Sequence, residues 1–224
     1  MEAVLKIGGS LTKQPKSLVK LCKELSVLAQ IHRIVVVPGG GEFADTVRRL
    51  DKKFRLSNVS AHKMATLAMD QFGLLLSDIT PDSYVSYEIK EIKKKLETKL
   101  PIFLPSKFMF LEDPLENSWD VTSDSISAYF ADKLEAKKLI LVTDVDGIFN
   151  RDPKSSQKTR LIDEVSVDEL LNLGERTSVD KCTPQLLSKS YLDCYVVNGH
   201  YPERVDAVLL GQRTKCTRIL RLVY

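Results

Sequence analysis

Short, nearly continuous runs of apolar residues recur along this chain, and each run stops at glycines or polar side chains. The clearest runs are 4–7, 34–37, 139–142 and 194–197. Apolar runs of this length are typical of strands buried on both faces, as in a parallel sheet. Residues 101–105, bracketed by prolines, and 217–223 are predicted to form two more strands.

Between these runs, apolar residues recur at steps of three and four, which is the spacing of an amphipathic helix. The predicted helices cover 18–29, 42 onward, 60–76, 84–100, 126–134, 165–173, 178–192 and 202–210. Ser60 is expected to cap the third of them. Alternating strands and helices, without repeats or a linker, predict one domain over 1–224. Its fold class is α/β, a three-layer αβα sandwich with a mostly parallel central sheet.

Composition narrows the class of protein. With 224 residues, 43% hydrophobic and 28% charged, the chain can bury one substantial core. No apolar run approaches the roughly 20 residues of a membrane helix, and no signal-peptide pattern is present, so we expect a cytoplasmic protein without a membrane partner. A net charge of +3 is too slight to indicate nucleic-acid binding. The four scattered cysteines are expected to be reduced thiols.

The stretch 139–149 carries the strongest candidate chemistry. Its apolar run is followed by Thr143, Asp144, Asp146, Gly147 and Phe149, and Asp152 lies three residues beyond the stretch. In open α/β sheets, ligands bind at the carboxyl ends of the strands. Carboxylates and a hydroxyl there could hold a nucleotide and its Mg²⁺. A polar turn that caps a buried strand is an equal alternative.

Two glycine-rich loops follow the first two strands. Gly8, Gly9 and Ser10 come directly after the strand that contains Lys6, and 39–41 are three glycines before a predicted helix. Glycines let backbone N–H groups approach an anion, and a helix N-terminus favours negative charge. A plain turn remains the alternative for each loop. Neither loop has the spacing of a Walker P-loop.

Two further segments contain candidate binding residues. His62 lies in the first turn of a predicted helix, where the helix dipole disfavours positive charge, so either an anion faces it or its place is a surface accident. Asp120, Thr122 and Asp124 alternate after Trp119 and could present one polar face to a ligand. The alternative is that Asp120 is a helix cap and Asp124 an ordinary first-turn acid.

Together these loops resemble the amino acid kinase superfamily, in the family's order from residue 4 to about 210. The resemblance implies a mostly parallel sheet of about eight strands. It also implies an acceptor-binding half up to about residue 115 and an ATP-binding half at about 116–224. The implied cofactors are ATP and Mg²⁺, with no side chain assigned as a metal ligand. Homo-oligomers are common in this family, so one is expected here.

The resemblance also implies roles for individual residues. The implied catalytic residues are Lys6, Asp124 and Lys181, the last in an uncertain register. The implied nucleotide contacts are Gly8, Gly9, Ser10, Thr143, Asp144, Asp146, Gly147, Phe149 and Asp152. The implied acceptor contacts are Gly39, Gly40, Gly41, His62, Trp119, Asp120 and Thr122. A second lysine in a Gly-Met-x-x-Lys stretch, found in acetylglutamate-type members, is replaced here by 178–184.

Two segments, 61–73 and 118–125, more narrowly resemble the small kinases of methanofuran biosynthesis. These kinases phosphorylate 5-(aminomethyl)-3-furanmethanol phosphate to its diphosphate. The implied acceptor therefore has a phosphate, a furan ring and an ammonium group. We expect His62 and the glycines to suit the phosphate, Trp119 the ring, and Asp120 or Asp70 the ammonium.

Two other functions stay open. One is a different phosphate-acceptor kinase of the superfamily, chiefly isopentenyl phosphate kinase, whose hydrophobic acceptor needs an apolar tunnel. The other is a nucleotide-binding sensor or storage protein without turnover, against which the presence of both Lys6 and Asp124 argues.

Overall fold

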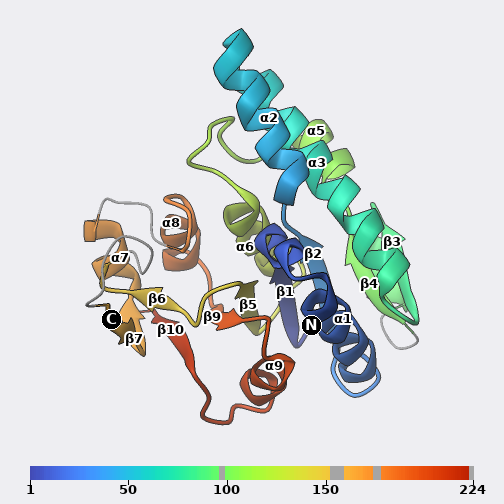
Figure 1. Cartoon of the computed structure of the whole chain (residues 1–224), viewed down its shortest axis with the longest axis vertical. Coiled ribbons are helices and arrows are strands. Elements are labelled where there is room, and N and C mark those ends of the chain that lie inside the picture. Colours follow the sequence, from blue (N-terminus) through green and yellow to red (C-terminus); the bar gives the residue numbers. More distant parts are fainter. Residues whose placement is uncertain (96–98, 152–158, 174–177, 222–224) are drawn as a thin grey trace.

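The computed structural model describes residues 1–95, 99–151, 159–173 and 178–221. Figure 1 shows a central sheet with helices packed on its faces. The strands of the main sheet are β1 (Ala3–Ile7), β2 (Ile34–Pro38), β3 (Ser83–Ser86), β4 (Leu100–Phe103), β5 (Lys138–Thr143), β8 (Glu164–Ser166), β9 (Asp193–Asn198) and β10 (Cys216–Leu220). A separate antiparallel pair is formed by β6 (Ile148–Phe149) and β7 (Leu161–Ile162).

The eight strands lie in the order β3-β4-β2-β1-β5-β9-β10-β8. The sheet is parallel except that β10 runs antiparallel to β9, and β8 follows the direction of β10. In the centre, Lys6 of β1 is the register partner of Val37 on one side and Leu141 on the other. The loops that follow β1, β2 and β5 therefore meet at one edge, where ligands bind in sheets of this kind.

Helices cover both faces of the sheet (Figure 1). The helices are η1 (Gly9–Lys13), α1 (Pro15–Leu28), α2 (Gly41–Phe54), α3 (Asn58–Ile79), α4 (Ile89–Lys95), α5 (Ser106–Glu112), α6 (Ser123–Lys133), α7 (Val167–Leu173), α8 (Thr183–Ser188) and α9 (Pro202–Leu209). Side chains of β1 alternate between two cores. Val4 packs with residues of α6, whereas Leu5 and Ile7 pack with residues of α1 and α9. The predicted αβα sandwich with a mostly parallel sheet of eight strands is confirmed.

The predicted helix at 84–100 is wrong in its first part and at its end. Tyr84 and Val85 lie in β3, which pairs with β4, and α4 begins only at Ile89. Leu100, the last residue of the prediction, is already the first residue of β4. Aromatic and β-branched residues favour strands, and the sheet edge supplies a partner that outweighs the helical spacing of the charges.

The predicted helix at 178–192 is also too long, because α8 is confined to Thr183–Ser188. Ahead of it, the Asp180 side chain accepts a hydrogen bond at 2.9 Å from the backbone N–H of Thr183, the first residue of the helix. The helix predicted at 165–173 begins at Val167, because 164–166 pair with β10.

The cap predicted for α3 lies three residues too late. Ser57, not Ser60, is the N-cap, and its hydroxyl accepts from the backbone N–H of Ser60 at 3.2 Å. At the other end of the chain, the strand predicted at 217–223 spans Cys216–Leu220, and 222–224 lie outside the described residues. No helix in the described ranges is both long and apolar enough to cross a membrane.

Candidate active site

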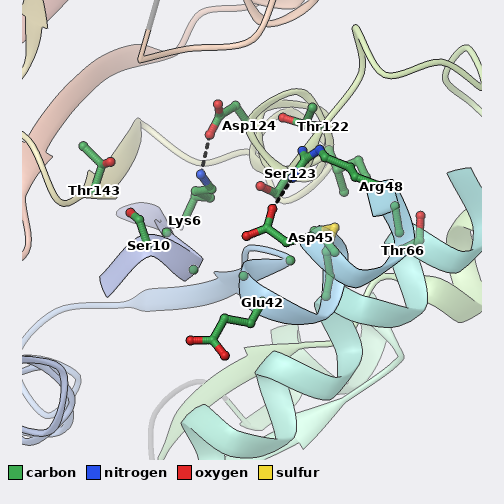
Figure 2. Close-up of a pocket in the computed structure, with 18 of the residues that line it drawn as sticks. Lys6, Ser10, Glu42, Asp45, Arg48, Thr66, Thr122, Ser123, Asp124 and Thr143 are labelled. Atoms are coloured by element: carbon green, nitrogen blue, oxygen red, sulfur yellow. Dashed lines mark hydrogen bonds and ion pairs between the residues drawn. The ribbon is translucent and has the colours of Figure 1, made fainter. Parts of the chain in front are cut away.

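A cavity of about 320 Å³ opens at the carboxyl ends of β1 and β5 and beside the first turns of α2 and α6. Figure 2 shows side chains from these elements and from α3 converging on it. Predicted site residues that line it are Lys6, Gly8, Gly9, Ser10, Gly40, Gly41, His62, Trp119, Thr122, Asp124 and Thr143. The topology thus brings residues from both ends of the chain to one cavity.

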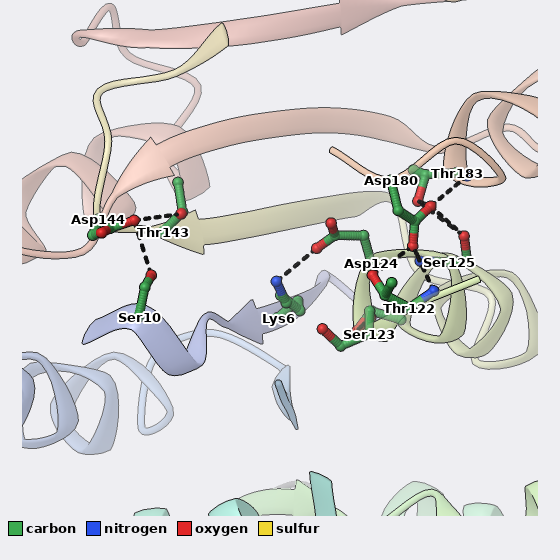
Figure 3. Close-up of polar contacts among 11 residues, drawn as sticks. Lys6, Ser10, Thr122, Ser123, Asp124, Ser125, Thr143, Asp144, Asp180 and Thr183 are labelled. Atoms are coloured by element: carbon green, nitrogen blue, oxygen red, sulfur yellow. Dashed lines mark hydrogen bonds and ion pairs between the residues drawn. The ribbon is translucent and has the colours of Figure 1, made fainter. Parts of the chain in front are cut away.

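Lys6 of β1 and Asp124 of α6 both line the cavity and form an ion pair with each other (Figures 2 and 3). Lys6 Nζ lies 2.6 Å from Asp124 Oδ1, and the two side chains are only 13% and 10% exposed. Burial raises the pKa of Asp124, and the lysine partly offsets that rise. Such a pair holds the ammonium of Lys6 in a fixed position, where it can interact with an anionic group of a ligand.

The two glycine loops pack directly against each other. A Cβ at Gly9 would collide with the Cα and N atoms of Gly41, and a Cβ at Gly40 would collide with that of Ala44. Gly41 also has a φ of +53°, a conformation that favours glycine. The glycines are therefore needed for the contact between the loops, as well as for any approach to phosphate.

Ser10 connects the first glycine loop to the end of β5. Its hydroxyl donates to Asp144 Oδ1 at 2.9 Å, and the Thr143 hydroxyl donates to the same oxygen at 3.3 Å (Figure 3). Hard oxygen donors of this kind suit Mg²⁺. Within the described residues, no group of three or more His, Cys, Asp and Glu side chains could hold a metal ion.

Asp180 fixes the start of α6. Its carboxylate accepts from the backbone N–H groups of Thr122 at 2.8 Å, Ser125 at 3.1 Å and Thr183 at 2.9 Å, and from the hydroxyls of the same three residues (Figure 3). Burial alone would raise the pKa of Asp180, but the hydrogen bonds from Ser125, Thr122 and Thr183 outweigh burial and lower the pKa. One buried carboxylate thus joins the first turns of α6 and α8 and sets the position of Asp124.

The outer wall of the cavity comes from α2, α3 and the loop before α6. His62 is 7% exposed, and its Nε2 has no hydrogen-bond partner among the described residues. Burial lowers the pKa of His62, which favours the neutral form of the ring in this structure. The Nε2 atom of His62 can offer a hydrogen bond to a ligand. Trp119 lines the same wall and donates from Nε1 to Asp51 Oδ2 at 2.7 Å.

Four predicted nucleotide residues lie outside the cavity lining. Asp144 is the first, although it accepts a hydrogen bond from Ser10, which does line the cavity. Asp146 binds Arg204 Nη1 and Lys215 Nζ, each at 2.6 Å. Burial alone would raise the pKa of Asp146, but hydrogen bonds from Lys215, Arg204 and Asn198 lower it to about 2. Gly147 packs against Thr217.

Phe149 is the fourth of these residues and lies in β6 opposite Leu161. Asp152 falls outside the described residues.

Several predicted catalytic or acceptor residues also lie away from the lining. Lys181 Nζ is 3.5 Å from Asp120 Oδ1, and both side chains are more than half exposed. Gly39 donates its N–H to the carbonyl of Ile7 at 2.8 Å, one step before the lining glycines. Asp70 accepts hydrogen bonds from the N–H and hydroxyl of Ser106 and so caps α5. The roles given to these residues stay predictions.

Lining residues that the sequence reasoning missed include Asp45 and Arg48 of α2. Their spacing could have identified them, because Gly41, Asp45 and Arg48 are separated by four and three residues and so lie on one face of the helix. Asp180 had no comparable signal. Its partners Thr122 and Ser125 are 58 and 55 residues away in the chain.

Three comparisons with known proteins are consistent with this geometry. The sequence model of the amino acid kinase family matches residues 1–198. A (5-(aminomethyl)furan-3-yl)methyl phosphate kinase from Methanocaldococcus jannaschii is 38% identical over 220 residues, which cover 97% of each chain.

Two crystal structures share the fold. Uridylate kinase from Archaeoglobus fulgidus superposes with a TM-score of 0.78 at 22% identity, covering 98% of this chain and 100% of that chain. The isopentenyl phosphate kinase of T. acidophilum gives a TM-score of 0.65 at 20% identity, with the same coverage of 98% and 100%.

Proposed function

The chain belongs to the amino acid kinase family, and we propose that it transfers the γ-phosphoryl group of ATP to the phosphate of (5-(aminomethyl)furan-3-yl)methyl phosphate, called the furan phosphate below. Both resemblances stated from the sequence, to the superfamily and to the narrower group of kinases, are confirmed by the comparisons. The relative from M. jannaschii supports this acceptor, because it carries the corresponding name and matches over nearly the full length of both chains.

The observation that carries the proposal is the buried Lys6–Asp124 pair beside two touching glycine loops. In the reaction, an oxygen of the acceptor phosphate forms a bond to the γ-phosphorus, and the bond to the β–γ bridging oxygen of ATP breaks. The products are ADP and the furan diphosphate. The acceptor oxygen is already anionic, so no general base is required. The protein then has to align the two phosphates and neutralise charge, which Lys6 and the start of α2 are placed to do.

The proposal divides the cavity between two ligands. Ser10, Thr143 and Asp144 face the nucleotide, and Mg²⁺ bound with ATP would supply neutralisation of the β- and γ-phosphates. The acceptor takes the side lined by Gly40, Gly41 and His62, with an apolar wall for its ring. The division of the chain into an acceptor half and an ATP half is part of this proposal.

The decisive experiment measures products for a panel of acceptors. The purified protein is incubated with Mg²⁺–ATP and either the furan phosphate, isopentenyl phosphate or UMP, and diphosphate or nucleoside diphosphate products are detected by mass spectrometry. We expect the furan phosphate to give a kcat/KM at least about a hundredfold above that of the others. Preferred turnover of isopentenyl phosphate or UMP would overturn the acceptor assignment, and no turnover of any acceptor would favour a nucleotide sensor.

Assembly and location are further parts of the proposal. We predict a homo-oligomer, and its support here is that Leu67, Leu74 and Leu75 of α3 are 43%, 52% and 37% exposed. Light scattering coupled to size-exclusion chromatography would reveal a monomer if this is wrong. A cytoplasmic location also stays a prediction, which cell fractionation tests.

A further inference from the structure

Three carboxylates line the cavity within the described part of the chain: Glu42, Asp45 and Asp124. Asp124 already holds Lys6. Figure 2 shows Glu42 pointing away from Lys6, whereas Asp45 points toward the space between α2 and the start of α6. Of the three, Asp45 is therefore the carboxylate placed to meet an acceptor.

The position of Asp45 is set by a chain of contacts. Arg48 Nη1 lies 2.9 Å from Asp45 Oδ1, and the Arg48 guanidinium stacks 4.8 Å from the centroid of the Trp119 ring. Trp119 is itself held by its hydrogen bond to Asp51 at 2.7 Å. Arg48 contacts Oδ1 of Asp45. The other carboxylate oxygen, Oδ2, has no partner among the described residues, so it can accept a hydrogen bond from a ligand.

We infer that Asp45 binds the ammonium group of the acceptor and so makes the site selective for aminomethyl acceptors, an inference that rests on the function proposed above. If the acceptor phosphate lies at the N-terminus of α2, Asp45 is one turn further along this helix. At 1.5 Å per residue, it lies about 6 Å along the axis from Gly41. That step is comparable with the width of a furan ring and its methylene groups.

The wall between the two charged ends suits a ring. Ala65 and Met69 of α3 and Val121 and Ile126 near the start of α6 line the cavity with apolar side chains. A small ring can therefore pack there while its two charged substituents reach opposite ends. Arg48 covers one face of Trp119, so that face cannot stack on the furan.

A carboxylate can serve two cations at once, and this protein contains an example. Asp146 accepts from both Arg204 and Lys215 at 2.6 Å. In the same way, Asp45 can keep Arg48 on one oxygen and receive the ammonium on the other. Asp70 and Asp120, which the sequence suggested for the ammonium group, are less suitable. Asp70 accepts a hydrogen bond from Ser106, and Asp120 pairs with Lys181 outside the cavity lining.

The test compares two acceptors that differ only in the ammonium group. Wild type and Asp45→Asn are assayed with the furan phosphate and with its hydroxymethyl analogue, in which an alcohol replaces the amine. Asp45 is 60% exposed without a ligand, and a bound acceptor would shield it from water. In the variant, KM for the amine should therefore rise at least about tenfold, while KM for the alcohol changes less than about twofold. Because binding rather than transfer is affected, kcat should stay within about threefold for both acceptors. Asp78→Asn on the exposed surface of α3 is the matched control, with no expected change.

The outcomes separate the two proposals. An equal change for both acceptors, or none for either, would overturn the role of Asp45 and leave the proposed function standing. If wild type phosphorylates neither furan acceptor, both proposals fail. Calorimetric titration of the furan phosphate into wild type and Asp45→Asn gives a second measurement that does not depend on turnover, and an unchanged dissociation constant would equally refute the inference.

Discussion

Two lysine–aspartate pairs use aspartates that are four residues apart in the chain, Asp124 and Asp120, and the surroundings of the two pairs differ sharply. Lys6 lies 2.6 Å from Asp124 with side-chain exposures of 13% and 10%, whereas Lys181 lies 3.5 Å from Asp120 with exposures of 51% and 62%. Water screens the second pair, so its contribution is small, while the first acts in a low-dielectric cavity. Identical residue types thus have unequal capacity to act on a ligand.

The difference comes from the elements that carry the residues. Lys6 lies in the central strand, with β2 and β5 on either side, and Asp124 lies in the first turn of α6, which Asp180 holds. Lys181 and Asp120 lie in the segments that precede α8 and α6. The geometry therefore predicts catalysis that depends strongly on the buried pair and weakly on the exposed one.

Replacement of Lys6 should give the largest effect. In Lys6→Met the cavity loses the cation that we propose meets the transferred phosphoryl group, and Asp124 is left buried without its partner. We expect kcat to fall about a thousandfold, measured by coupled ADP release. Lys20→Met, on the exposed side of α1, should keep full activity. If circular dichroism shows that Lys6→Met is folded and kcat falls less than about tenfold, catalysis does not depend strongly on the buried pair.

The contact between the glycine loops should come next. In Gly9→Ala the added methyl group collides with the backbone of Gly41, so one loop must move away from the other. A displacement of about 1 Å at a reacting centre costs about a hundredfold, and we expect kcat/KM to fall by about that factor.

Gly211→Ala is the control for this prediction, because its Cβ meets nothing within 4 Å but φ there is +70°. It should lower the free energy of unfolding by about 1 kcal/mol and leave kcat/KM unchanged. Equal activity in Gly9→Ala and wild type would show that the loops tolerate separation.

Removal of the charge on Asp180 should affect stability and activity together. Asp180→Asn puts an amide group among donors that need an acceptor, so the free energy of unfolding should fall by about 2–4 kcal/mol. The start of α6 then shifts with Asp124, and kcat should fall about tenfold. Chemical denaturation measures the first quantity, and initial rates the second. Asp193→Asn, which breaks an exposed pair with Arg218, should cost less than about 1 kcal/mol.

The same residue predicts a pH dependence. The pKa of Asp180 is lower in the folded protein than its usual value, so its stabilisation is present above about pH 4 and is lost as the pH falls below that value. The free energy of unfolding of Asp180→Asn should therefore fall less steeply than that of wild type on acidification. If the free energies of unfolding of the two proteins fall in parallel below pH 4, the Asp180 carboxylate does not cause the pH dependence.

Much of the fold could be predicted from the sequence because buried parallel strands appear as apolar runs. The runs at 4–7, 34–37, 139–142 and 194–197 all became strands of the sheet. The short strand β3 was missed, because an edge strand is partly exposed and has no continuous apolar run. Its pairing with β4 comes from tertiary contact, which local spacing does not reveal.

The site was predictable where it follows strand ends and glycine loops, as at Lys6, Gly9 and Thr143. It was not predictable where long-range contacts decide the surroundings of a side chain. Asp120 and Asp124 look equivalent in the sequence, yet only Asp124 reaches the cavity lining. Likewise, the pKa of His62 depends on burial by residues far away in the chain.

The smallest effect is expected at the exposed pair, which makes it the sharpest test of the comparison. Lys181→Met and Asp120→Asn should each change kcat/KM by less than about fivefold, because a solvent-exposed pair contributes at most about 1 kcal/mol. The double variant should match the sum of the two single changes within error, measured with the furan phosphate and Mg²⁺–ATP. A loss in Lys181→Met as large as that in Lys6→Met would show that Lys181 reaches the phosphoryl group during turnover. The catalytic role first predicted for Lys181 would then be correct. The exposed position of its side chain in this structure would differ from its position during catalysis.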